Sequence, residues 1–190
     1  MDFFTNSEDA GDMGRLLAEI HNQPLLTESY SYTYLDGQYI LSQSKQENMP
    51  FHSEIRDALK KTDGILQKIT EDLTTPSVVL WNQENEKKAY GNPAWDLGLV
   101  INMLSGDDKA NIFLQEYLGR NGVQVTVIEL YIGILYAKLN KAIVSHDVVL
   151  WRRLANNECY TVVYGEGFHF EEISSKTLAR LGLPGLHRVE

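Results

Sequence analysis

The chain has 190 residues, of which 43% are hydrophobic and 23% are charged, the balance of a soluble globular protein. This length fits a single domain, residues 1–190, that can bury about 70% of its unfolded surface without disulfides or metal. The net charge of −9 argues against nucleic acid or an anionic membrane as a partner, because both favour surfaces rich in lysine and arginine. No apolar run approaches the length of a membrane-spanning helix. Cys159 is the only cysteine and the first residues do not resemble a signal peptide, so we expect a cytoplasmic protein.

The first predicted element is a short amphipathic helix. Met13, Leu16, Leu17 and Ile20 recur at the i, i+3, i+4 and i+7 spacing of one helix face. We expect this helix to end near His21, which we interpret as a partly buried structural residue.

A tyrosine-rich β-hairpin is predicted over residues 30–42. Tyr30, Tyr32 and Tyr34 alternate before the pair Asp36 and Gly37. An Asp-Gly pair supplies the positive φ angles of a type I′ turn. The three tyrosines are also candidates for a surface that contacts a partner protein.

Residues 43–50 are predicted to form a polar loop, followed by a long helix over residues 53–73. Apolar residues recur along that helix at helical spacing, beginning with Ile55 and Leu59. Residues 77–81 are expected to form a short buried strand.

The second half of the chain is predicted to be mainly helical. Asn92 and Pro93 form a favourable helix start, with asparagine as N-cap and proline in the first turn. Asp107 and Ser145 are expected to cap later helices. The remaining predicted elements are helices at 107–118, 125–143 and 145–154, strands at 160–164 and 168–171, and a final helix at 174–182. Together these elements indicate an α+β fold that is predominantly α-helical.

The segment from Tyr90 to Gly98, Tyr-Gly-Asn-Pro-Ala-Trp-Asp-Leu-Gly, resembles the Gly-Asp-Pro-Ala-x-Asp-Leu-Ala signature of aminoglycoside phosphotransferases and their choline-kinase-like relatives. The segment Gly14–His21 is similar to the helix that follows the lobe hinge in that family. The resemblance extends over residues 11–156 by order of elements, with residues 157–190 as an added strand and helix extension. It implies the helical carboxy-terminal lobe of a protein-kinase-like phosphotransferase, with added β-hairpins, in which the aspartate corresponding to Asp96 is structural.

The catalytic parts of that family have no counterpart in the sequence. Phosphoryl transfer needs a phosphate cradle, a base and carboxylates that hold Mg²⁺. The first helix is expected to begin near residue 12, which would leave no room for a nucleotide lobe before it. No His-Gly-Asp-x-x-x-x-Asn loop lies between that helix and residue 78. The family's metal-binding strand ends in Ile-Asp-Trp-Glu, whereas this chain has Leu-Trp-Asn-Gln-Glu at residues 80–84. Asn82 or Glu84 therefore replaces the metal-binding aspartate, depending on the alignment.

The leading hypothesis is a non-catalytic, pseudokinase-type protein that acts as a binding or regulatory partner, with a protein partner or a homodimer. We predict no catalytic residue, no metal site and no cofactor, since the histidines show no paired metal spacing. The first alternative is a small-molecule-binding protein for a cationic or sugar-like acceptor, which would use Asn82, Glu84 and Asp96. The second alternative is a residual phosphotransferase whose nucleotide lobe lies on another chain.

Overall fold

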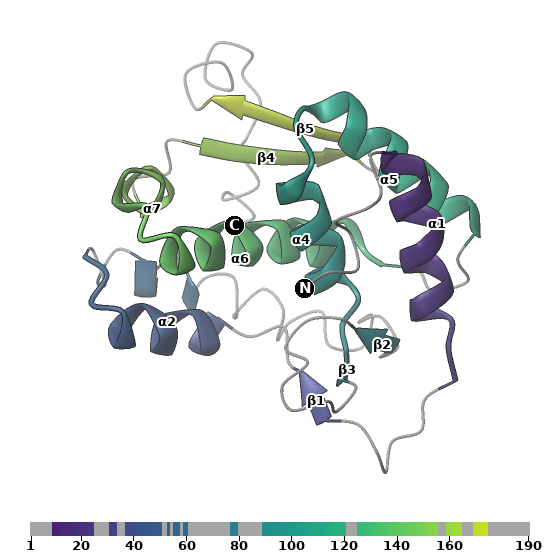
Figure 1. Cartoon of the computed structure of the whole chain (residues 1–190). Coiled ribbons are helices and arrows are strands. Elements are labelled where there is room, and N and C mark those ends of the chain that lie inside the picture. Colours follow the sequence, from purple (N-terminus) through teal and green to yellow (C-terminus); the bar gives the residue numbers. More distant parts are fainter. Residues whose placement is uncertain are drawn as a thin grey trace.

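The computed structural model describes residues 9–24, 31–33, 37–50, 53, 55–57, 59, 60, 77–79, 89–120, 125–155, 159–164 and 169–174, with β1, β4 and β5 described by their backbones. The elements are α1 (Ala10–His21), β1 (Ser31–Thr33), α2 (Gly37–Gln46), β2 (Ser77–Val79), β3 (Ala89–Gly91), α4 (Ala94–Met103), α5 (Asp107–Arg120), α6 (Val127–Val144), α7 (Val148–Ala155), β4 (Cys159–Tyr164) and β5 (His169–Ser174). Most described residues are helical, which confirms the predominantly helical α+β class. Figure 1 shows β4 and β5 on one side of the central helices α4 and α6, and the small sheet of β1, β2 and β3 on the other.

Helix α1 forms where the apolar stripe predicts it and packs against α5. Asp9 is its N-cap and accepts a hydrogen bond from the Gly11 amide at 2.8 Å. The two helices approach closely at Gly14, because a Cβ atom there would lie 2.5 Å from the Phe113 carbonyl oxygen. Leu17 lies fully buried on the same stripe.

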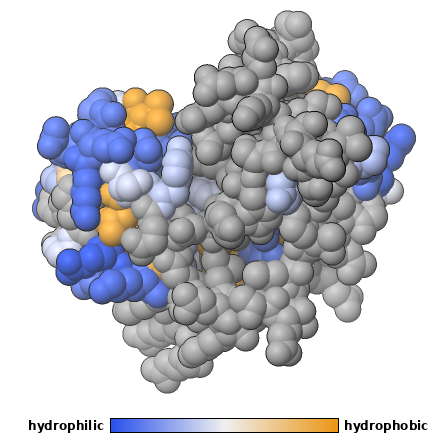
Figure 2. Space-filling model, turned by 90° about the horizontal axis from the view of Figure 1, so that it is seen from below, coloured by the Kyte–Doolittle hydropathy of each residue, from blue (hydrophilic) through white to orange (hydrophobic). Residues whose placement is uncertain are grey.

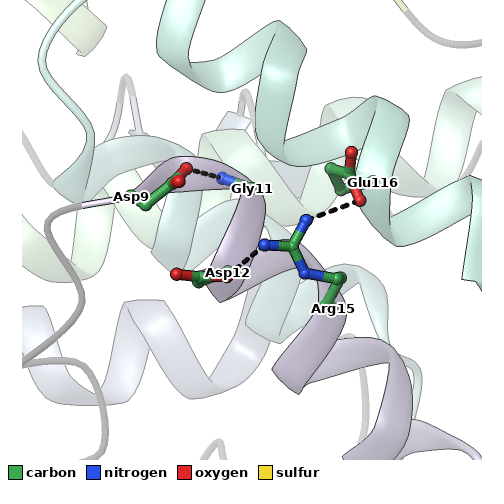
Figure 3. A network of polar contacts seen from close by, with 5 residues as sticks. All are labelled: Asp9, Gly11, Asp12, Arg15 and Glu116. Atoms are coloured by element: carbon green, nitrogen blue, oxygen red, sulfur yellow. Dashed lines mark hydrogen bonds and ion pairs between the residues drawn. The ribbon is translucent and has the colours of Figure 1, made fainter.

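Arg15 joins α1 to α5 at the surface. Its guanidinium donates to Glu116 of α5 at 2.9 Å and also to Asp12 of its own helix, as Figure 3 shows. These hydrogen bonds, first that to Glu116 and then that to Asp12, raise the pKa of Arg15 above its usual value. The contact orients the two helices, although exposed ion pairs of this kind add little stability.

Helices α4 and α6 cross at small residues. A Cβ atom at Gly98 or at Gly133 would approach the backbone of the other helix to less than 3.0 Å, and at Gly133 the nearest atom is the Ala94 carbonyl oxygen. Asn102 extends this contact by donating to the carbonyl oxygens of Gly98 at 2.9 Å and Ile134 at 3.2 Å. The backbones of α4 and α6 are therefore in direct contact at this crossing.

The predicted hairpin over residues 30–42 is wrong, because residues 37–46 form α2. Gly37, Ile40, Leu41 and Ser44 are all buried, and their i, i+3, i+4, i+7 spacing is that of a helix face. The predicted loop over residues 43–50 is therefore helical as far as Gln46.

Strand β1 belongs to a three-stranded sheet with the order β1-β3-β2. It runs parallel to β3, with Tyr32 opposite Tyr90. Strand β2 runs antiparallel to β3 and is buried, as predicted for its first three residues. Residues 80 and 81 of the predicted strand lie outside the described residues. Residues 53, 55–57, 59 and 60 are helical, which confirms the described part of the predicted long helix.

Helix α5 begins at Asp107, so this residue opens the helix rather than capping it from outside. Helix α6 begins with a capping box, in which the Thr126 side chain accepts from the Glu129 amide and the Glu129 side chain accepts from the Thr126 amide. The predicted cap of α7 by Ser145 is wrong: Ser145 ends α6, and the Asp147 side chain accepts from the Leu150 amide at 2.9 Å.

Two helices end with a left-handed residue. His146 has a φ of 49° after α6, and Asn48 has a φ of 52° after α2. In each case the residue that follows donates back to the helix, from Asp147 to Ala142 and from Met49 to Ser44, both at 2.9 Å. This is the Schellman arrangement, in which glycine usually occupies the left-handed position. The two turns contact one another through His146 and Glu47, whose side chains lie 3.2 Å apart.

Strands β4 and β5 pair antiparallel from Cys159 opposite Ser174 to Tyr164 opposite His169, which confirms both predicted strands. Ser174 is the last residue of β5 rather than the start of a helix, and the rest of the predicted final helix lies outside the described residues. The strands contact α6 and α5.

The described surface is mostly hydrophilic on the side shown in Figure 2, with hydrophobic residues in small separate patches. Met103, Val144 and Val149 are among the large apolar side chains that are more than half exposed. None of the described helices has both the length and the hydropathy needed to cross a membrane.

Candidate functional site

The segment from Gly91 to Gly98 is the candidate site, because it carries the sequence resemblance. It leads from the end of β3 into α4, and all of its residues are buried. Pro93 is the N-cap residue of α4, one position later than predicted, and makes no side-chain cap. Asn92 nevertheless caps the helix in part, because its side-chain oxygen accepts from the Ala94 amide at 2.9 Å.

Asn92 also joins α4 to α6. Its side-chain amide donates to Oε1 of Glu129 at 2.6 Å. Oε2 of Glu129 accepts from the backbone amide of Thr126 at 2.9 Å and from its hydroxyl at 2.8 Å. Glu129 is fully buried and lies in the first turn of α6. The carboxylate therefore holds the starts of both helices together.

Asp96 occupies the first turn of α4 and takes part in a second buried network. Its Oδ2 lies 3.1 Å from Nε2 of His21, at the end of α1. Nδ1 of the same ring lies 2.7 Å from the Tyr117 hydroxyl on α5. The side chains of His21 and Asp96 are 0% and 2% exposed. His21 is thus more deeply buried than the partly buried residue predicted from the sequence.

The donor and acceptor roles in this network depend on the tautomer of His21. A carboxylate can only accept, so Nε2 of His21 donates wherever Asp96 is ionised. In a neutral imidazole Nδ1 then accepts the hydrogen bond of the Tyr117 hydroxyl. The three side chains connect α4, α1 and α5 in one chain of hydrogen bonds.

Trp95 packs in the core on the opposite side of the segment. Its ring centroid lies 5.5 Å from that of Tyr136 on α6 and 6.5 Å from that of Tyr39 on α2. Trp151 on α7 is equally buried, and its indole N–H donates to the Pro50 carbonyl oxygen. Both tryptophans are core residues.

Of the predicted ligand-binding residues, Asp96 is described and Asn82 and Glu84 lie outside the described residues. Of the predicted partner surface, Tyr32 lies in β1, with only its backbone described, and Tyr30 and Tyr34 lie outside. Among the residues that the structure describes, no three histidine, cysteine, aspartate or glutamate side chains are grouped so as to hold a metal ion.

Three members of the networks, Thr126, Glu129 and Tyr117, were not predicted from the sequence. Thr126 and Glu129 match the Ser/Thr-x-x-Glu pattern of a capping box, and this pattern could have located the start of α6. Tyr117 has no such signal, because a tyrosine on an apolar helix face is read as a core residue.

Comparison with protein-family models, with curated proteins and with solved structures yields no match to this chain.

Proposed function

We propose that the chain is a non-catalytic, phosphotransferase-like protein that acts as a binding or regulatory partner of another protein. The proposal rests on the signature segment (residues 91–98), whose polar side chains form hydrogen bonds to other helices of the fold. Asn92 is hydrogen-bonded to Glu129, and Asp96 is hydrogen-bonded to His21. Both residues are buried.

Catalysis of phosphoryl transfer needs carboxylates that face a nucleotide and its Mg²⁺. Asn92 has a neutral amide where the family has an aspartate, and a neutral ligand holds Mg²⁺ poorly without companion charge. The Asp96 carboxylate is directed at the His21 imidazole, which matches the structural role that the resemblance implies for it. The signature segment therefore serves as a scaffold that fixes α4 against α1 and α6, which is compatible with a protein that binds without catalysing.

A sheet edge is the best candidate for the partner site. Strand β1 is the last strand on its side of the three-stranded sheet, within the described residues. The backbone N–H and C=O groups of an end strand can pair with a strand of a partner, and alternate side chains provide the specificity. Tyr32, at the centre of β1, is the residue to vary first.

Calorimetry with Mg²⁺·ATP, choline and an aminoglycoside tests the non-catalytic half of the proposal. We expect neither binding nor release of ADP. Micromolar binding of Mg²⁺·ATP together with phosphoryl transfer would show that the chain is an enzyme. Binding of choline or the aminoglycoside alone, lost in Glu84→Ala, would instead establish the small-molecule alternative.

Affinity capture followed by cross-linking mass spectrometry tests the partner half. We expect one protein, or a second copy of the chain, to be retained by the native protein and lost in Tyr32→Ala. Val149→Ala is the matched control, because Val149 is a highly exposed apolar residue on α7. Equal retention by both variants would exclude β1 as the site. A strict monomer in light scattering, with nothing captured, would remove the binding role.

A further inference from the structure

An open pocket of about 240 Å³ shares no lining residue with the hydrogen-bond networks of Asn92 and Asp96. Its walls come from the end of α4, the start of α5, the second half of α6, and α7, including Ile101 and Leu150 as apolar residues. Asn102 forms part of the wall, and its two hydrogen bonds to the α4 and α6 backbones hold it in place. The pocket is thus bounded by helices whose relative positions the α4–α6 crossing determines.

Two lysines and one aspartate are the charged residues of this pocket. Lys138 lies on α6 and is only 8% exposed, Lys141 lies one turn further along the same helix, and Asp107 opens α5. The side-chain charges therefore sum to +1 in a protein whose net charge is −9. The amino end of α5, which carries a partial positive charge, adds to this local excess.

The lysines are held near the pocket by the fold. Lys141 donates to the Asn102 carbonyl oxygen at 3.4 Å, which directs its ammonium group across the pocket wall toward α4. Lys138 and Asp107 each have a further interaction within the fold, so a ligand would add to their contacts. Because the side-chain charges of the lining sum to +1, the pocket favours an anion over a cation.

The size and lining restrict the ligand further. Pockets for drug-sized molecules begin at about 300 Å³, so this pocket suits a smaller molecule. Ile101, Leu104 and Leu150 offer apolar surface beside the charged groups. We propose that the pocket binds a small organic anion, a carboxylate or a phosphate monoester with a short apolar portion. This proposal does not depend on the proposed function, because the residues involved lie outside the signature segment.

Calorimetry with butyrate, glycerol 3-phosphate and inorganic phosphate tests the proposal, with choline as a cation of similar size. We expect at least one of the organic anions to bind with a Kd of millimolar or below, and choline not to bind. Binding of glycerol 3-phosphate alone would identify phosphate as the recognised group, and binding of butyrate alone would identify carboxylate. The affinity should fall as salt is added, because the attraction is electrostatic.

Two substitutions of opposite sign locate the binding. Lys141→Gln removes one positive charge and should weaken anion binding about tenfold, the usual cost of losing a charge-assisted hydrogen bond. Asp107→Asn removes the opposing carboxylate and should strengthen anion binding. Lys45→Gln, on α2 and outside the pocket, is the matched control. Absence of binding by all three anions, or binding that Lys141→Gln and Asp107→Asn leave unchanged, would overturn the proposal.

Discussion

Gly133 of α6 lies directly on Ala94 of α4, so closely that a Cβ atom at Gly133 would come within 3.0 Å of the Ala94 carbonyl oxygen. The neighbouring contact of Gly98 with the Gly133 backbone is equally close. The atoms in the way are backbone atoms, which cannot move aside as a flexible side chain can. The crossing of α4 and α6 therefore depends on these two glycines.

Gly133→Ala should destabilise the protein. The added methyl group forces α4 and α6 apart, and overpacking of this kind costs about 1–3 kcal/mol. The unfolding temperature should fall by about 2–4 °C for each kcal/mol in a chain of this size. Calorimetric or fluorescence-monitored unfolding measures the change.

Gly119→Ala is the matched control for that experiment. Gly119 lies near the end of α5, and among the described residues no atom beyond its own turn of helix lies within 4 Å of the position of a Cβ. Alanine there should raise stability by about 0.5–1 kcal/mol, because glycine is the more flexible residue in the unfolded chain. Equal effects of the two substitutions would contradict the close crossing.

Asp96→Ala should destabilise the protein by about 1–3 kcal/mol, since it leaves Nε2 of the buried His21 without its hydrogen-bond partner. Asp108→Ala, in the first turn of α5 and exposed, should change stability by less than about 1 kcal/mol. Denaturant unfolding of both variants gives the comparison. A loss below 1 kcal/mol for Asp96→Ala would show that the network contributes little.

Asn92→Asp should produce a pH-dependent loss of stability. The new carboxylate would face Glu129 at the 2.6 Å contact, and two adjacent buried carboxylates disfavour double ionisation. The folded variant would then bind more protons than the unfolded chain, so its stability falls as pH rises. Its deficit relative to the native protein should be larger at about pH 7 than at about pH 5. Asn92→Ala, which adds no charge, should show a deficit that varies less with pH.

His146→Gly should stabilise the protein by about 0.5–1 kcal/mol, because the φ of 49° at His146 is unfavourable for a side chain and free for glycine. The lost contact with Glu47 involves exposed groups and offsets little of the gain. His146→Ala, which keeps the Cβ atom, should show no such gain. Unfolding curves of the two variants separate the backbone effect from the ion pair.

The helices with a clear apolar period could be predicted from the sequence, as the stripe from Met13 to Ile20 shows. The hairpin prediction failed because Asp36-Gly37 is a strong local turn signal. The burial of Ile40, Leu41 and Ser44 against the rest of the fold determines a helix there instead. Tertiary packing overrides local preference in such cases.

The polar networks were predicted only in part. Asp96 was expected to be structural if the resemblance held, but its partners come from helices distant in the sequence. His21 precedes it by 75 residues, and a single sequence contains no signal for that pairing. The pocket beside Lys138 was not predicted for the same reason, since its lining residues come from four separate elements.

The contacts of α1 join segments that are far apart in the sequence, and this separation affects folding during synthesis. His21 meets Tyr117 and Arg15 meets Glu116, at separations of 96 and 101 residues. A ribosome adds about 5–20 residues per second, so α1 leaves the ribosome several seconds before α5 exists to cover it. During that interval its apolar stripe is exposed to solvent, to other nascent chains and to chaperones. Pairing of such distant segments is intrinsically slow, and the contacts between α1 and α5 can form only after Tyr117 has been synthesised.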